Sequence, residues 1–150
     1  MLIESRPSLD PELAALVTAQ QRELAAAGTG AGDRIFEPHD DVAYLVGVVQ
    51  GRAVACGAWQ ALDGGVAEVR RMYVRPAFRG RGLARQMIVA VEEEALAAGC
   101  PVIRLAAGTR LTAAIALYQS SGYRQVEPFG EHAAGPDRLC FEKRLPALVQ

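Results

Sequence analysis

Long apolar runs are missing from this sequence. No stretch approaches the roughly 20 consecutive apolar residues that a membrane-spanning helix needs. Residues 1–6 also lack the character of a secretory signal peptide. We therefore expect a cytoplasmic protein without a membrane partner.

Cysteine and histidine are equally scarce. Cys56, Cys100 and Cys140 are odd in number and widely separated, which favours reduced, buried thiols over a disulfide framework. No neighbouring base marks any of them as a nucleophile. His39 and His132 stand far apart without Cys or His neighbours, so the spacing of a metal site is absent. We expect no bound metal.

An excess of charge of one sign is absent too. The formal net charge is -1, which gives no general attraction to nucleic acid or to an anionic membrane. With 51% hydrophobic and 22% charged residues the chain has the composition of a folded globular protein. Its length of 150 residues predicts a single domain over 1–150.

Turn residues and a change of hydrophobic period divide the chain into elements. Asp10 before Pro11 is a typical helix start, and short glycine turns separate three β-rich segments, as in an antiparallel meander. We expect strands at 2–6, 42–50, 52–62, 66–75, 101–106, 123–126 and 139–143, helices at about 11–24, 84–95 and 112–121, and an irregular segment or short further helix at 34–41. This order predicts a mixed α/β (α+β) sheet with helices on its faces. Within the helix at 84–95, Glu92, Glu93 and Glu94 are expected to begin a more polar side.

The most informative segment joins the strand at 66–75 to the next helix. Gly80 and Gly82 stand where that helix begins, and the free N–H groups of a first helical turn bind anions. The dinucleotide fingerprint is excluded because Arg85 occupies the place of its third glycine, and the Gly-Lys-Ser/Thr of nucleotide phosphate loops is absent. What remains is Arg-x-x-Gly-x-Ala at Arg79, Gly82 and Ala84. A plain tight turn is the alternative interpretation.

These residues resemble the pyrophosphate signature of the GNAT superfamily of acyl-CoA-dependent N-acyltransferases. The resemblance covers residues 42–123 by pattern and the first forty residues only by the order of elements. It implies a central, mostly antiparallel, twisted sheet of six to seven strands, parted between the fourth and fifth strands and flanked by about four helices. It also implies acetyl-CoA as the co-substrate.

The resemblance further implies where the coenzyme lies. The pyrophosphate would bind the backbone of the turn, at Arg79, Gly80, Arg81, Gly82, Leu83 and Ala84. The pantetheine arm would run beside Met72, Tyr73 and Val74 as an added strand does, with the Val74 N–H polarising the thioester carbonyl. The arginines between positions 70 and 85 leave a nucleic-acid-binding strip as a competing interpretation. Coenzyme phosphates account for a few of them, and we expect no nucleic-acid partner.

A second pattern lies in the helix at 112–121. Ala114, Leu117, Tyr118, Gly122 and Tyr123 match the family's Ala-x-x-Leu-Tyr-x-x-x-Gly-Phe/Tyr motif, which implies that Ala114, Leu117 and Tyr118 adjoin the coenzyme. Tyr118 would protonate the departing thiolate; a plain core tyrosine is the alternative. Many relatives carry Asn before this helix, whereas Gly108-Thr109-Arg110-Leu111 stands here, so that a contact from the Thr109 hydroxyl is the substitute.

Glu68 is the candidate general base. It lies eleven residues before Arg79, the spacing at which several relatives place a glutamate that deprotonates the amine, directly or through water. Strand alternation puts Glu68 on the same face as Arg70, so a plain ion pair between them is the alternative. His39, Glu131 and His132 are weaker candidates.

The function expected is acetyl transfer from acetyl-CoA to a primary amine in a ternary complex. A non-catalytic acyl-CoA-binding or sensing module of the same fold is the alternative. The acceptor, a small-molecule or peptide amine, and the existence of a homodimer both stay open. Acidic residues near the expected acceptor end suggest an acidic rim that attracts a cationic amine, or merely soluble loops. They are Glu37, Asp40, Asp41, Glu131 and Asp137.

Overall fold

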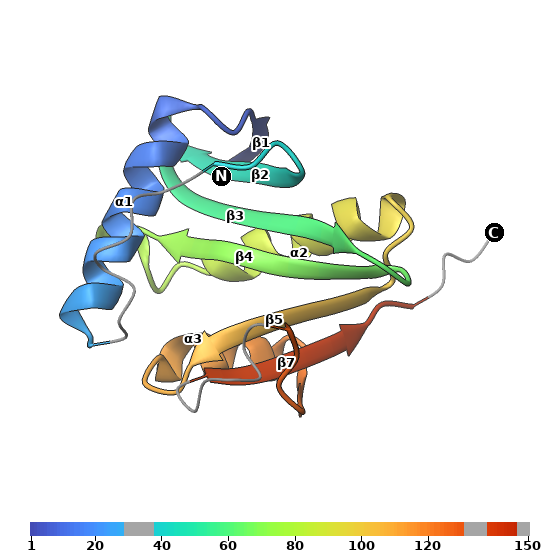
Figure 1. Cartoon of the computed structure of the whole chain (residues 1–150). Coiled ribbons are helices and arrows are strands. Elements are labelled where there is room, and N and C mark those ends of the chain that lie inside the picture. The colour runs from blue at the N-terminus through green and yellow to red at the C-terminus, as the bar shows by residue number, and fades with distance from the viewer. Residues whose placement is uncertain (29–37, 131–137, 147–150) are drawn as a thin grey trace.

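The computed structural model describes residues 1–28, 38–130 and 138–146, which form one seven-stranded sheet with helices on its faces (Figure 1). The strands are β1 (Leu2–Arg6), β2 (Val42–Val49), β3 (Arg52–Leu62), β4 (Val66–Val74), β5 (Val102–Gly108), β6 (Arg124–Val126) and β7 (Arg138–Arg144). The helices are α1 (Pro11–Ala26), α2 (Leu83–Ala97) and α3 (Thr112–Ser120), with a short 3-10 helix η1 (Pro76–Phe78). The mixed α/β fold predicted from the sequence is confirmed.

The sheet parts in its middle. Its strand order is β1-β2-β3-β4-β5-β7-β6, and every neighbouring pair is antiparallel except β4 with β5. Those two parallel strands are paired only from Val66 opposite Val102 to Glu68 opposite Arg104. Beyond these residues β4 continues to Val74 and β5 to Gly108 without pairing with each other. Figure 1 shows the two strands diverging toward the ends of α1 and α3.

The helices bury apolar residues on opposite faces of this sheet. On one face α1 packs Leu13, Leu16 and Val17 against β3 and β4, in a cluster that also includes residues of β2, while on the other α2 packs Met87 and Val91 against β3 and β4. α1 begins as expected, because the Asp10 side chain accepts a hydrogen bond from the Leu13 N–H at 2.9 Å. In Figure 1, α1 lies before the sheet and α2 behind it.

Two expectations need correction. About four helices were expected, but the described residues form three α-helices, and most of the segment at 34–41 lies outside them. Glu92 was expected to begin the polar side of α2. It is instead buried, and it accepts hydrogen bonds from the Tyr123 hydroxyl at 2.7 Å and from Lys143 Nζ at 3.1 Å. These two partners compensate the cost of burying its carboxylate. Within the described ranges, no helix is both long and apolar enough to cross a membrane.

Candidate active site

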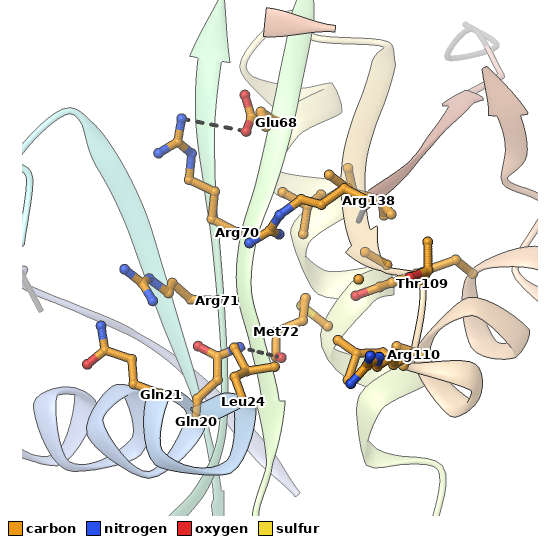
Figure 2. Close-up of a pocket in the computed structure, with 18 of the residues that line it drawn as sticks. Gln20, Gln21, Leu24, Glu68, Arg70, Arg71, Met72, Thr109, Arg110 and Arg138 are labelled. Atoms are coloured by element: carbon orange, nitrogen blue, oxygen red, sulfur yellow. Dashed lines mark hydrogen bonds and ion pairs between the residues drawn. The ribbon is translucent and has the colours of Figure 1, made fainter. Parts of the chain in front are cut away.

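A cavity of about 450 Å³ opens where β4 and β5 part. Figure 2 shows α1 along one side of it and the loop after β5 along the other, with Arg138 extending inward from β7. The lining consists of Gln20, Gln21 and Leu24 of α1, Gly28 just after it, Glu68 to Met72 of β4, Leu105 to Leu111 of β5 and its loop, Ala114 and Tyr118 of α3, and Arg138. Segments that are far apart in the sequence therefore meet at the divergence of the two strands.

A β-bulge shapes the β4 wall of this cavity. Ala58 pairs with Arg70 and Cys56 with Tyr73, so that Arg71 and Met72 both lie opposite a single residue of β3. Arg71 has a φ of 58°, which is uncommon for a residue other than glycine.

The bulge reverses the alternation of side chains along β4. Before it, Ala67 and Val69 pack on the α2 side of the sheet. After it, Val74 packs on the α2 side and Tyr73 on the α1 side. No glycine or asparagine marks the left-handed position, so the sequence contains no signal of this bulge.

The backbone of β4 beyond the bulge turns toward the gap. The Arg75 N–H donates to the Val54 carbonyl at 2.9 Å, which makes the neighbouring pair, Ala55 with Val74, a non-hydrogen-bonded one. The Val74 N–H and C=O accordingly point away from β3, toward the side where β5 has diverged. The Val74 carbonyl accepts a hydrogen bond from Arg79 Nε at 2.9 Å, and the Met72 carbonyl accepts one from Gln20 Nε2 at 3.0 Å.

The glycine turn forms the start of α2. Gly80 and Gly82 have φ values of 79° and 76°, a conformation that favours glycine, and no described atom lies within 4 Å of a Cβ built on either. Gly82 is the N-cap and gives no side-chain cap, and the first turn of α2 holds no acidic residue. No side chain of the first turn or of the N-cap therefore competes for the first-turn N–H groups and the helix dipole.

Tyr118 reaches the cavity from α3 and is only 7% exposed. Its ring meets that of Tyr123 edge to face at 5.9 Å, and Tyr123 is in turn held by the buried Glu92. Burial raises the pKa of Tyr118 to about 12, so the phenol keeps its proton at neutral pH. The same cause raises the pKa of the buried Cys56 thiol to about 12.

Glu68 lies in the cavity wall on β4, shortly before the bulge at Arg71. Its carboxylate is 3.6 Å from Arg70 Nη2, and its side chain is 12% exposed against 37% for Arg70. The ion pair suggested by strand alternation is thus present. It does not remove Glu68 from the cavity, because both residues line it.

Comparisons with known proteins agree with this geometry. The model of the acetyltransferase (GNAT) family matches residues 13–123. The chain belongs to this family. An IAA acetyltransferase of Azospirillum brasilense is 39% identical over 107 residues, which cover 70% of this chain and 69% of that protein.

Solved GNAT-type structures share the fold. A protein of Klebsiella pneumoniae described as an acyl-CoA N-acyltransferase superposes with a TM-score of 0.81 at 32% identity, covering 96% of this chain and 97% of that one. The PaiA N-acetyltransferase of Thermoplasma acidophilum, solved in complex with coenzyme A, has a TM-score of 0.74 at 13% identity over 96% of this chain and 99% of that one. At this low identity the second likeness concerns the fold alone.

The site residues expected for a GNAT acetyltransferase fall into two groups. The cavity brings together Glu68, Met72, Thr109, Ala114 and Tyr118. The others do not line it. They are Tyr73, Val74, Leu117 and the α2 turn with Arg79, Gly80, Arg81, Gly82, Leu83 and Ala84. Leu117 packs against the core on the α2 side, and Tyr73 is buried on the α1 side.

Two arginines of the turn are held by the protein itself. Arg79 binds Glu23 of α1 at 2.6 Å as well as the Val74 carbonyl, and Arg81 stacks over the Phe78 ring at 5.2 Å. Arg79 therefore ties the turn to α1 and β4, and the backbone amides are what the turn presents to a ligand. Arg85 is exposed, and it donates to the Ser120 and Ser121 hydroxyls at the surface.

Sequence reasoning missed several cavity residues. The sequence signal that could have pointed to Gln20 and Gln21 is that they interrupt the apolar residues of α1, and in the structure Gln21 is only 5% exposed. Arg110 and Arg138 had no such signal, since their convergence depends on the tertiary fold.

The expected acidic rim is not found in the described lining. Asp40 accepts a hydrogen bond from Ser8, and Asp41 accepts one from Gln60 at 2.6 Å; neither aspartate lines the cavity. Glu37, Glu131, His132 and Asp137 lie outside the described residues. In the described part of the chain, no group of three or more His, Cys, Asp or Glu is placed to hold a metal ion.

Proposed function

We propose that this chain transfers the acetyl group of acetyl-CoA to a primary amine, by direct attack of the amine while both substrates are bound. The observation that carries the proposal is the parting of β4 from β5 beyond Glu68, which opens a cavity lined by both a buried phenol and a carboxylate. Membership of the acetyltransferase (GNAT) family supports the same chemistry.

Three features of the chain fit an acyl-CoA. The first-turn amides of α2 suit a pyrophosphate, and the open space around Gly80 and Gly82 lets phosphates approach the backbone. The Val74 N–H points into the gap, where it suits an amide of the pantetheine arm or the thioester oxygen. The coenzyme supplies an activated acetyl thioester, and the protein supplies position and polarisation.

We assign the proton that the sulfur receives to Tyr118. A cysteine-like thiol has a pKa of about 8.5 in water, well below that of a buried phenol, and this difference would disfavour the transfer. Desolvation removes the mismatch, as the pKa of about 12 shared by the buried Cys56 thiol and Tyr118 illustrates. We propose that a coenzyme thiolate leaving beside the buried Tyr118 is partly desolvated in the same way and takes the Tyr118 proton.

We assign the removal of the amine's proton to Glu68, directly or through a water. A primary ammonium has a pKa of about 10.4 and cannot attack until it loses a proton. Glu68 lines the cavity together with Tyr118, so that base and acid flank the same space.

The test is release of free thiol from acetyl-CoA in the presence of a library of amines. Thiol release that requires both the protein and a particular amine supports the proposal. Binding of acetyl-CoA, seen as a rise in melting temperature, without thiol release for any amine would instead favour a non-catalytic acyl-CoA-binding module. A cytoplasmic location and the state of association stay predictions.

A further inference from the structure

We propose that the amine acceptor also carries an oxyanion, a carboxylate or a phosphate, and that Arg70 and Arg138 bind it. This inference rests on the proposed acetyl transfer and names the class of acceptor that the same cavity selects.

The cavity has a charge that the whole chain does not have. Its charged lining residues are Glu68 and four arginines, namely Arg70, Arg71, Arg110 and Arg138, whereas the chain has a formal net charge of -1. Charges of one sign gathered around a cleft with low-dielectric walls focus their field inside it. Such a cavity attracts an anionic group and repels a polycation.

Arg70 offers a donor that the protein leaves unused. Its Nε is buried and has no hydrogen-bond partner among the described residues. Its contact with Glu68 runs through Nη2 at 3.6 Å, which is longer than a good hydrogen bond. A buried donor without a partner carries the full cost of its desolvation, and an oxyanion of a ligand would remove that cost.

Arg138 reaches the cavity from β7, on the side away from β4. It begins β7, opposite Gly108 of β5, and Figure 2 shows its side chain extending toward β4. No hydrogen bond or ion pair joins its guanidinium to another residue of the described ranges. A guanidinium presents its N–H groups as a fork that matches a carboxylate or a phosphate. Arg70 and Arg138 thus bring two such groups to one cavity from its two walls.

The amine end of the acceptor has complementary partners. Gln20 donates its Nε2 to the Met72 carbonyl, which leaves Oε1 as a buried acceptor without a partner among the described residues. Glu68 lies beside Arg70. The cavity lining therefore holds acceptors for an amine as well as donors for an oxyanion, which is the pattern that a zwitterionic amine requires.

The pyrophosphate of the coenzyme does not account for Arg70 and Arg138. Its expected phosphate site is the turn at Gly80 and Gly82, which is outside the cavity lining. Arg110 is less informative than Arg70 and Arg138, because its Nη1 lies 3.0 Å from a Cβ built on Gly28, just beyond the end of α1. At this position, near the C-terminal end of α1, the helix dipole is enough to favour the positive charge of Arg110 without a ligand.

The experiment compares matched acceptors by thiol release from acetyl-CoA. One pair is an α-amino acid and its carboxamide, another is an aminoalkyl phosphate and the corresponding amino alcohol, and a polyamine completes the panel. Because hydrogen bonds to charged groups are the stronger ones, we expect kcat/KM to favour the anionic member by about 10- to 100-fold in at least one pair. A preference in the first pair would identify the oxyanion as a carboxylate, and a preference in the second would identify it as a phosphate.

Variants assign the preference to residues. Arg138→Gln should raise KM for the anionic acceptor by about 10-fold or more, while KM for acetyl-CoA and the rate with the neutral partner hold. Arg70→Lys tests the second arginine, because lysine keeps the charge but loses the fork. Arg144→Gln is the matched control, since Arg144 lies on the same strand at its other end, opposite Val102, and should change nothing.

Each outcome decides between the two proposals. Equal or better rates with the neutral amines or the polyamine would overturn the oxyanion assignment while leaving acetyl transfer in place. An Arg138→Gln variant that keeps the full preference, with Arg70→Lys also unchanged, would overturn it as well. Absence of thiol release with every amine would overturn acetyl transfer and this inference together.

Discussion

Replacing Tyr118 with phenylalanine removes one hydroxyl and little else. The ring stays, so its edge-to-face contact with Tyr123 and its place in the core are kept. The described residues offer the Tyr118 hydroxyl no hydrogen-bond partner, so the change should leave no protein group unsatisfied. We expect the melting temperature to stay within about 3 °C, since a change of 1 kcal/mol moves a domain of this size by about 2–4 °C.

The catalytic effect should be far larger than the effect on stability. A positioned general acid contributes about 10²- to 10⁴-fold, so Tyr118→Phe should lower kcat at least about 100-fold. Binding of acetyl-CoA should hold, because the phenol acts on charge that develops as the thioester breaks. A loss confined to kcat would therefore separate proton donation from a role in packing.

The pH profile gives an independent check. With a pKa of about 12, Tyr118 stays protonated across the usual assay range, so the wild-type rate should not fall between pH 8 and about 10.5 through loss of this proton. The assay is kcat against pH for both proteins, with acetyl-CoA and an active amine at saturation.

Two results would refute this reasoning. Wild-type turnover in Tyr118→Phe would make Tyr118 a core residue only. A falling limb near pH 10 that disappears in the variant would mean that the phenol titrates at its ordinary value, against the effect of its burial.

Three further predictions follow from the site. Gly82→Asp should abolish the stabilisation by acetyl-CoA, which is about 2.7 kcal/mol at a hundredfold excess over Kd. Gly82→Asn should keep most of it, because asparagine tolerates a positive φ as aspartate does but carries no charge. Equal thermal shifts in the two variants would contradict a phosphate site. Glu68→Gln should depress the rate at neutral pH and recover as pH rises toward the amine's own pKa; a profile of unchanged shape would leave Glu68 as a partner of Arg70 alone. The folded-state pKa of Tyr118 lies above the unfolded value of 10.0, so its contribution to stability is present below pH 10 and is lost as pH rises to about 12. Between pH 8 and 11.5, urea unfolding should therefore show a loss of stability that is smaller in Tyr118→Phe by about 2 kcal/mol. Equal losses in the two proteins would mean that Tyr118 ionises when folded.

The expectations that held were the ones that depend on neighbours in the sequence. The cap at Asp10, the turns between β2, β3 and β4, and the glycines before α2 act over a few residues, so their chemistry is legible in the sequence. The same holds for Glu68 with Arg70, since alternation within one strand is enough to pair them.

The cavity itself could not be predicted in this way. Its charge arises because Arg70 and Arg138 lie on strands that meet only through the order β4-β5-β7. The burial of Glu92 has the same origin, because its partners Tyr123 and Lys143 come from segments after β5. A glutamate in a run of three glutamates looks like surface until its distant partners are known.

The bulge at Arg71 fits the proposal that one strand serves both substrates. If β4 alternated regularly, Tyr73 would share the face of Ala67 and Val69, and Val74 would share that of Glu68 and Arg70. The extra residue moves Val74 to the α2 side and keeps Glu68 on the cavity side. β4 can then present Glu68 to an acceptor before the bulge and the Val74 backbone to a coenzyme after it. The bulge requires the uncommon φ of 58° at Arg71, and a left-handed conformation costs a residue other than glycine about 1–2 kcal/mol. The pairing of β4 with β3 on both sides of the bulge holds Arg71 in this conformation.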